Sequence, residues 1–186
     1  AAGIRRTADP ASEQMDQILF GEVFDVLEDV DQGCFFGQAR RDGYVGFVEA
    51  QALIPAADDP PTHRVAALRT YAFAEASIKS RTSGPYSINS LVRVEAEEGR
   101  LSKIAGGGWI TTAHLSPIGA FESDWAAVAE RFRGAPYLWG GRESLGLDCS
   151  GLVQQALFAC GLSCPRDTDQ QAATGREIPR AEFGRG

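Results

Sequence analysis

The 186-residue chain is 44% hydrophobic and 23% charged and contains 21 glycines and nine prolines, which is enough apolar material for a packed core but too many turn formers for a helical bundle. The formal charge is −7, and no basic stripe could displace the counterions of a nucleic acid, so we expect no nucleic-acid partner. No run approaches the roughly 18 apolar residues that span a bilayer. The four cysteines fit neither a disulfide scaffold nor a zinc site, so we expect reduced thiols, no metal and no cofactor.

Residues 1–57 are predicted to form a small β-barrel. Its predicted strands are apolar runs separated by turn formers: Ile18–Leu27, Cys34–Ala39, Tyr44–Val48 and Leu53-Ile54. Asp42-Gly43 between two of these runs is a strong hairpin signal. Residues 56–63 contain an Asp-Asp-Pro-Pro run that suits neither a helix nor a strand, and they are predicted to be a linker.

Residues 58–121 repeat this pattern. The apolar runs here are Val65–Phe73, Ser90–Val94, Arg100–Ile104, Trp109-Ile110 and Leu115. Residues 21–26 align with residues 89–94, and residues 48–53 align with residues 110–115. This weak internal repeat favours two small β-barrels, with coincidence between two β-rich sequences as the alternative.

Residues 122–186 change to a helical period. Trp125, Val128 and Phe132 share one face of a predicted helix that begins after Ser123 or Asp124 and stops at Gly134. A second helix is predicted from near Cys149 to Gly161, with an apolar face formed by Leu152, Val153, Ala156, Leu157 and Cys160. A third helix is expected after Pro165, with Asp167 and Gln170 spaced as a capping box and Gly175 as its end.

Cys149 lies at the predicted first turn of the second helix. The unpaired N–H groups and the positive dipole end of a helix stabilise a thiolate, which is the nucleophilic form of cysteine. A nucleophile is therefore one interpretation, and a small buried packing residue is the other.

Several short motifs in the last segment occur in a fixed order: Gly134–Gly141, Gly146–Gln154, Gly161, Pro165-Arg166-Asp167 and Gln170. In order and spacing they resemble the N-terminal half of an NlpC/P60 cysteine peptidase domain. The two preceding segments, with Gly43–Val48, resemble the paired bacterial SH3-like domains of cell-wall endopeptidases. The resemblance implies an all-β plus α+β chain. In it, two SH3-like barrels (1–57 and 58–121) precede the helical half of a papain-like domain (122–186).

The resemblance further implies a peptidase that cuts the bond between γ-D-glutamate and diaminopimelate (or lysine) in peptidoglycan stem peptides. Its substrates would be murein tripeptides or tetrapeptides with a free N-terminal L-Ala. Cys149 matches the family nucleophile. By the same resemblance, the substrate-binding residues would be Tyr137, Asp148, Ser150, Asp167, Tyr44 and Glu22, of which Tyr44 and Glu22 belong to the first barrel.

The expected ammonium pocket has a physical basis. A substrate ammonium group must meet carboxylate and hydroxyl acceptors when it leaves water, and Asp167 with Tyr137 or Tyr44 could supply them. The alternatives are that Asp167 only caps a helix and that Tyr44 is an ordinary barrel aromatic.

One part of the family pattern is absent. The mechanism needs an imidazole that follows the cysteine, whereas His63 and His114 both precede it. We interpret both as surface or packing residues and expect residues 1–186 to be part of a longer protein. Two other function classes stay open: a module that binds muropeptides without cutting them, and an amidase or acyltransferase on the same scaffold. We expect a cytoplasmic location, with a periplasmic or extracellular one if a signal peptide has been removed.

Overall fold

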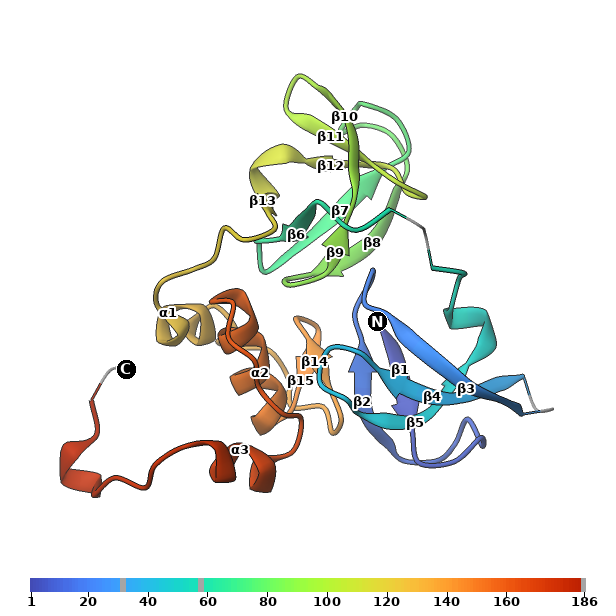
Figure 1. The fold of residues 1–186 in the computed structure, drawn as a ribbon. Helices are drawn as coiled ribbons and strands as arrows, with labels where there is room; N and C mark the ends of the chain where they lie inside the picture. Colours follow the sequence, from blue (N-terminus) through green and yellow to red (C-terminus); the bar gives the residue numbers. More distant parts are fainter. Residues whose placement is uncertain (31–32, 57–58, 185–186) are drawn as a thin grey trace.

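The structure is a computed structural model that describes residues 1–30, 33–56 and 59–184. It places two β-modules next to a helical segment (Figure 1). We call them barrel 1 (strands β1–β5), barrel 2 (strands β6–β13) and the helical segment (residues 122–184). Residues 57–58 of the predicted linker and residues 185–186 lie outside the described residues. Within the described residues, no helix is long and apolar enough to cross a membrane.

Barrel 1 is one antiparallel sheet in the order β2-β1-β5-β4-β3. Its strands are β1 (Ala2–Arg5), β2 (Gln14–Ile18), β3 (Phe24–Val30), β4 (Cys34–Ala39) and β5 (Val45–Glu49). β4 has the predicted bounds. The single strand predicted over Ile18–Leu27 is wrong, because the backbone turns at Gly21, which has a φ of 79°, and this turn separates β2 from β3. Ile4, Ile18 and Val48 form the core of the barrel.

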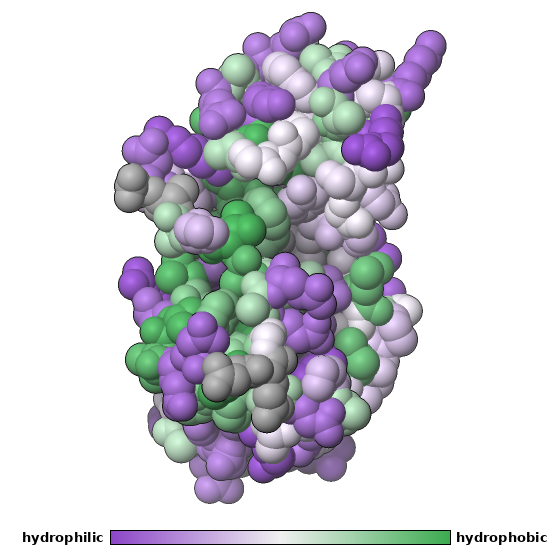
Figure 2. Space-filling view, turned by 90° about the vertical axis from the view of Figure 1, so that its right-hand side faces the viewer, coloured by the Kyte–Doolittle hydropathy of each residue, from purple (hydrophilic) through white to green (hydrophobic). Residues whose placement is uncertain are grey.

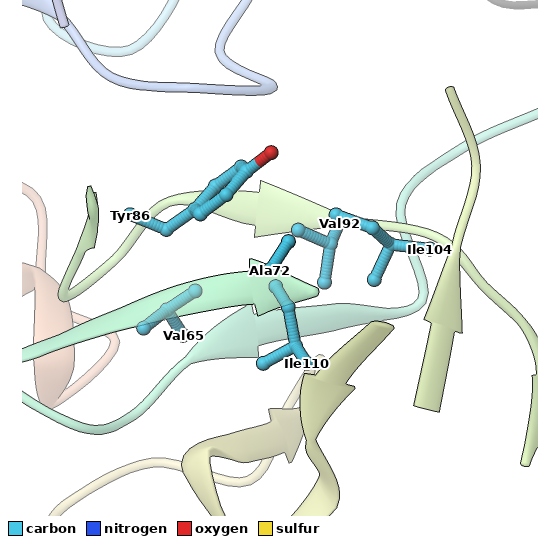
Figure 3. Packing of buried hydrophobic residues seen from close by; sticks show 6 residues of the cluster. All are labelled: Val65, Ala72, Tyr86, Val92, Ile104 and Ile110. Carbon is cyan, nitrogen blue, oxygen red and sulfur yellow. The ribbon is translucent and has the colours of Figure 1, made fainter. Parts of the chain in front are cut away.

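Barrel 2 contains a five-stranded and a three-stranded sheet, in the orders β10-β11-β12-β7-β8 and β13-β6-β9. The strands are β6 (His63–Val65), β7 (Arg69–Phe73), β8 (Thr82–Ser87), β9 (Leu91–Val92), β10 (Val94–Glu98), β11 (Leu101–Ile104), β12 (Trp109–Thr111) and β13 (Leu115–Pro117). Five aliphatic side chains and the ring of Tyr86 converge in its core (Figure 3).

The two barrels repeat one topology. The order β8-β7-β12-β11-β10 in barrel 2 corresponds strand for strand to β2-β1-β5-β4-β3 in barrel 1. A single turn of 3-10 helix follows β5 and β12, and it ends at Leu53 (φ −108°, ψ 147°) and Leu115 (φ −108°, ψ 148°). Asn89, which aligns with Gly21, shares its positive φ at 67°. The internal repeat predicted from the sequence is therefore confirmed.

The barrels contact each other through the turn that follows β2. Leu91 N donates to Phe20 O at 2.8 Å, and the Phe20 ring packs edge-on against Tyr86 with centroids 4.9 Å apart. Figure 2 shows hydrophobic residues at mid-height on this side of the molecule, where barrel 2 stands above barrel 1. Apolar contact thus fixes one barrel on the other.

The helical segment contains α1 (Trp125–Glu130), α2 (Cys149–Ala159) and α3 (Thr168–Thr174), a 3-10 turn at Arg180–Glu182, and a small hairpin of β14 (Arg142–Glu143) and β15 (Gly146–Leu147). The Asp124 side chain caps α1 by accepting from Ala127 N at 2.9 Å. SH3-like sheets followed by a short α/β region confirm the predicted fold class.

The predicted apolar face of α2 is partly wrong. Val153 is 41% exposed, whereas Gln154 and Gln155 are fully buried. Gln154 Nε2 donates to Asp42 of barrel 1 at 3.0 Å, and Gln155 Oε1 accepts from Asn89 of barrel 2 at 2.9 Å. The helix is therefore held between the barrels by its amides as well as by apolar packing.

Candidate active site

Cys149 is the first residue of α2, and it is exposed. The preceding residue, Asp148, is the N-cap, and its Oδ1 accepts from Gly151 N at 2.8 Å. The Cys149 Sγ lies 3.8 Å from Thr168 Oγ1 at the start of α3. Exposure contradicts the interpretation of Cys149 as a buried packing residue. The thiol instead meets solvent at a helix N-terminus, where a thiolate is stabilised.

The glycine-rich loop before α2 fixes where the helix begins. Gly140 N donates to Asp148 Oδ2 at 3.0 Å, and Asp148 N donates to Gly141 O at 3.2 Å. A Cβ placed on Gly151 would lie 2.3 Å from Gly141 O. The first turn of α2 therefore packs directly on the loop backbone, and only a glycine at 151 allows this approach.

A cavity of about 330 Å³ opens beside the thiol. Barrel 1 contributes Arg6, Glu13, Met15 and Tyr44 to its wall. Six of the seven residues predicted from the resemblance also line it: Cys149, Tyr137, Asp148, Ser150, Asp167 and Tyr44. The structure thus brings together side chains from both ends of the chain, although their roles toward a substrate stay predictions.

Tyr44 and Asp167 interact across the boundary between barrel 1 and the helical segment. Burial and the negative charge of Asp167 raise the pKa of Tyr44 to about 12. Burial raises the pKa of Asp167, against the opposing effect of the Arg166 charge and a hydrogen bond with Tyr44. Asp167 occupies the N-cap position of α3, but its side chain makes no capping hydrogen bond. The predicted capping box is therefore wrong in this respect, and the carboxylate faces the cavity.

Arg166 is buried under the cavity and binds the residues on both sides of Cys149. Its Nη2 donates to Asp148 Oδ2 at 2.6 Å, and its Nη1 donates to Ser150 Oγ at 2.6 Å. Burial alone would raise the pKa of Asp148, but hydrogen bonds from Arg166 and from Gly151 N hold it below its ordinary value. The sequence motif includes Arg166 but does not reveal this role, because Asp148 and Ser150 lie 18 and 16 residues away along the chain.

Glu22 is not among the residues that line the cavity, so this structure does not support its predicted contact with substrate. Its side chain is 2% exposed and forms ion pairs with Arg142 and with Arg41 Nε, the latter at 3.3 Å. Its Oε2 also accepts from Leu19 N at 2.9 Å. Glu22 thus belongs to a buried ionic cluster around Arg142, which Asp42 joins at 2.8 Å.

Sequence reasoning also missed Glu13, which lies on the cavity wall. Its carboxylate accepts from Trp139 Nε1 at 2.9 Å and from Arg6 Nε at 2.7 Å. The Trp139 contact attaches the aromatic loop of the helical segment to barrel 1, and the Arg6 contact holds Glu13 within barrel 1. The sequence around Glu13 contained no signal for the first contact, since Trp139 is 126 residues away.

The two histidines of the sequence lie in barrel 2. His63 Nδ1 is 2.8 Å from Thr62 Oγ1, and His114 Nδ1 is 2.8 Å from Thr70 Oγ1. Neither is among the described residues that line the cavity.

Two segments of the chain match models of known families. Residues 4–53 match the family described as "Bacterial dipeptidyl-peptidase Sh3 domain", and residues 134–186 match the NlpC/P60 family. A solved NlpC/P60 family protein from Bacillus cereus has a TM-score of 0.80 at 18% identity, covering 93% of this chain and 64% of that one. That likeness concerns the fold.

Two curated proteins are similar in sequence. The gamma-D-glutamyl-L-lysine dipeptidyl-peptidase of Bacillus subtilis is 28% identical over 176 residues, covering 88% of this chain and 59% of that protein. The peptidoglycan endopeptidase RipB of Mycobacterium tuberculosis is 38% identical over 66 residues, covering 28% of this chain and 27% of that protein. The chain therefore spans about three-fifths of the length of the Bacillus subtilis protein.

Proposed function

Because the chain carries an N-terminal bacterial SH3 domain followed by an NlpC/P60 region, we propose that its protein is a cysteine endopeptidase acting on peptidoglycan stem peptides. The bond cut is the one between γ-D-glutamate and diaminopimelate or lysine, in peptides that begin with a free L-Ala. The Bacillus subtilis relative is named a gamma-D-glutamyl-L-lysine dipeptidyl-peptidase, which supports this choice of bond.

The observation that carries the proposal is the shared cavity of Cys149, Asp167 and Tyr44. Cys149, a nucleophile, and Asp167, a carboxylate suited to an ammonium group, line the same cavity. Barrel 1 supplies part of the wall of that cavity through Tyr44. At about 330 Å³ the cavity is at the small end of the range for ligand sites. A short acyl group with a charged amine fits this site better than a long strand of cell wall does.

In the proposed reaction the Cys149 thiolate attacks the γ-carbonyl carbon of D-glutamate. A thioester forms as the C–N bond to the diamino acid breaks, and water then hydrolyses the thioester to release L-Ala-γ-D-Glu. The first turn of α2 stabilises the thiolate, and Asp167 with Tyr44 holds the substrate ammonium. A base must accept the thiol proton, and its conjugate acid must then protonate the leaving amine. His63 and His114 pair with threonines of barrel 2, so neither is assigned that role.

Cleavage of L-Ala-γ-D-Glu-diaminopimelate by the full-length protein tests the proposal. We expect release of the dipeptide, complete loss of turnover in Cys149→Ala, and a kcat/KM that falls by roughly two to three decades when the peptide is N-acetylated. That range corresponds to about 3–4 kcal/mol, which is within the cost of leaving a buried charge unpaired. Equal cleavage of the free and acetylated peptides would contradict the proposed role of the amine.

The same assay separates the two alternatives. Peptide binding without cleavage, in a protein whose Cys149 is intact, would indicate a non-catalytic muropeptide-binding module. Cleavage of a different amide, or transfer of the acyl group to an amine, would indicate an amidase or acyltransferase.

A further inference from the structure

Asp16 in β2 of barrel 1 is fully buried and lies beneath the candidate site. Its Oδ1 accepts from Arg166 Nε at 2.7 Å and lies 3.7 Å from Arg142 Nε. Asp16 is not among the residues that line the cavity, so it has no direct access to a substrate. Any effect of Asp16 on the site must therefore be transmitted through Arg166 or Arg142.

Arg166 transmits this contact to both neighbours of Cys149. The guanidinium binds Asp16 through Nε, Asp148 through both terminal nitrogens, and Ser150 through Nη1. A guanidinium is planar and its N–H groups point in fixed directions. Three partners on one rigid plane leave Arg166 one orientation, and Asp16 is the partner that belongs to another module.

Asp148 completes the connection to the thiol. Its two oxygens accept from Gly151 N and Gly140 N, so the same carboxylate caps α2 and holds the glycine loop. Cys149 is the next residue and the first residue of α2, a position typical of nucleophilic cysteines. Every link from Asp16 to this first turn is a hydrogen bond with a buried partner.

We propose that Asp16 is a positioning residue for the Cys149 thiol: through Arg166 it fixes Asp148 and Ser150, and with them the first turn of α2. Barrel 1 then contributes to the nucleophile itself as well as to the cavity wall. The inference rests on the proposed function for the role of Cys149, but its central measurement, the reactivity of the thiol, needs no peptidase activity.

The test is Asp16→Asn in the full-length protein, with alkylation of Cys149 by iodoacetamide followed by mass spectrometry. Asparagine keeps the shape and an acceptor oxygen for Arg166 but removes the charge. Burial raises the pKa of Asp16 to about 7, against the effect of Arg142 and Arg166. The rate is therefore measured at about pH 8, where the wild-type carboxylate is mainly ionised.

We expect Cys149 to react about fivefold more slowly in Asp16→Asn, the size of a helix-terminus interaction. If the peptide is cleaved, kcat should fall by a similar factor while KM changes less than twofold. Removing a negative charge without loosening the helix would instead favour the thiolate and speed alkylation. An unchanged or faster rate would therefore overturn the proposal.

The control is Asp25→Asn. Asp25 is also a barrel 1 carboxylate in a bidentate ion pair, with both Arg40 contacts at 2.7 Å, but that pair is exposed. Its substitution should leave alkylation of Cys149 unchanged. Cys34 and Cys164 are buried and serve as indicators of unfolding, because they should stay unlabelled in every variant that is folded.

If Cys34 and Cys164 become labelled in Asp16→Asn, that variant is unfolded, and a second variant provides the test. Arg166→Lys retains the charge but cannot hold three partners in one plane, and it should slow Cys149 to a similar extent. Where both single variants fold, the double variant should be no slower than Arg166→Lys alone, because the two residues act in series. Additive effects of the two substitutions would overturn the proposal.

Discussion

The four thiols of the chain lie in different electrostatic surroundings. Burial, Glu122 and Asp124 raise the pKa of Cys160, and burial with Asp42 raises that of Cys164. Cys34 is buried and donates to Ala8 O at 3.4 Å. Cys149 alone among them is exposed.

We therefore predict that iodoacetamide at neutral pH labels Cys149 first. A raised pKa leaves less thiolate at a given pH, and burial blocks the reagent. Peptide mapping after short exposures measures the order of labelling. Earlier labelling of Cys160 while the protein is folded would contradict the assignment of the nucleophile.

Asp167 should give substrate affinity a pH dependence. Its pKa is raised above the ordinary value of 3.8, chiefly by burial, and only the ionised carboxylate attracts an ammonium group. As pH falls through this raised pKa, the carboxylate is protonated and KM for the free-amine tripeptide should rise. Steady-state kinetics across the acidic range measures the effect. Asp167→Asn should show a high KM that no longer changes in that range, and a pH profile identical to wild type would contradict the role of Asp167.

At the scale of elements, the contact between α2 and the glycine loop favours glycine over alanine at position 151, which is the reverse of the ordinary helix preference. In a free helix, alanine is better than glycine by about 1 kcal/mol. Gly151→Ala would, however, place a methyl group 2.3 Å from Gly141 O. We expect it to lower the free energy of unfolding by about 1–3 kcal/mol, as overpacking does, and denaturant titration measures this.

Gly175→Ala is the matched control. Gly175 ends α3, has extended backbone angles, and has nothing within 4 Å of the position that an alanine methyl group would take. Its substitution should leave stability unchanged or slightly higher. Equal effects of the two substitutions would show that the α2 contact is not tight.

Elements with local signals were predictable from the sequence. The helices α1 and α3 begin after the expected positions Asp124 and Asp167, α2 begins at the expected Cys149, and α3 ends at the expected Gly175, because these signals are adjacent to their helices in the chain. The short strands β1 and β8 were missed, since Ala2–Arg5 and Thr82–Ser87 carry little alternation. The buried face of α2 was misassigned because the partners of Gln154 and Gln155 lie in the barrels.

The residues of the candidate site also divide into those with a local sequence signal and those with distant partners. Cys149 and Asp148 follow from a contiguous motif and lie on the cavity wall. Glu22 was expected to bind substrate, whereas it pairs with Arg142, which is 120 residues away. No local sequence pattern indicates such a pair. Glu13 was missed for the same reason, since its partner Trp139 is 126 residues away.

At the scale of the whole molecule, the buried side chain of Asn89 links barrel 2 to α2 by hydrogen bonds. Asn89 Nδ2 donates to both Gln155 O and Gln155 Oε1 at 2.9 Å. Asn89 also has a φ of 67°, which asparagine tolerates better than most residues. The residue therefore combines a turn conformation with a docking contact.

Two substitutions separate these contributions. Asn89→Ala loses the hydrogen bonds and strains the backbone, so the free energy of unfolding should fall by about 3 kcal/mol, whereas Asn89→Gly relieves the strain and should cost about 2 kcal/mol. Chemical denaturation of both variants measures the difference. A glycine variant as stable as wild type would contradict the docking role.

The turn that carries Asn89 has a counterpart in barrel 1, but the residue at the aligned position there is Gly21. Glu22 N donates to Leu19 O, and Ser90 N donates to Ser87 O at the aligned position, so the backbone of the turn is the same. A Cβ at Gly21 would lie 2.0 Å from Leu91 O, which excludes asparagine there, whereas a glycine could occupy position 89. At this turn, glycine thus allows the backbone of barrel 2 to approach barrel 1, and asparagine binds α2 to barrel 2.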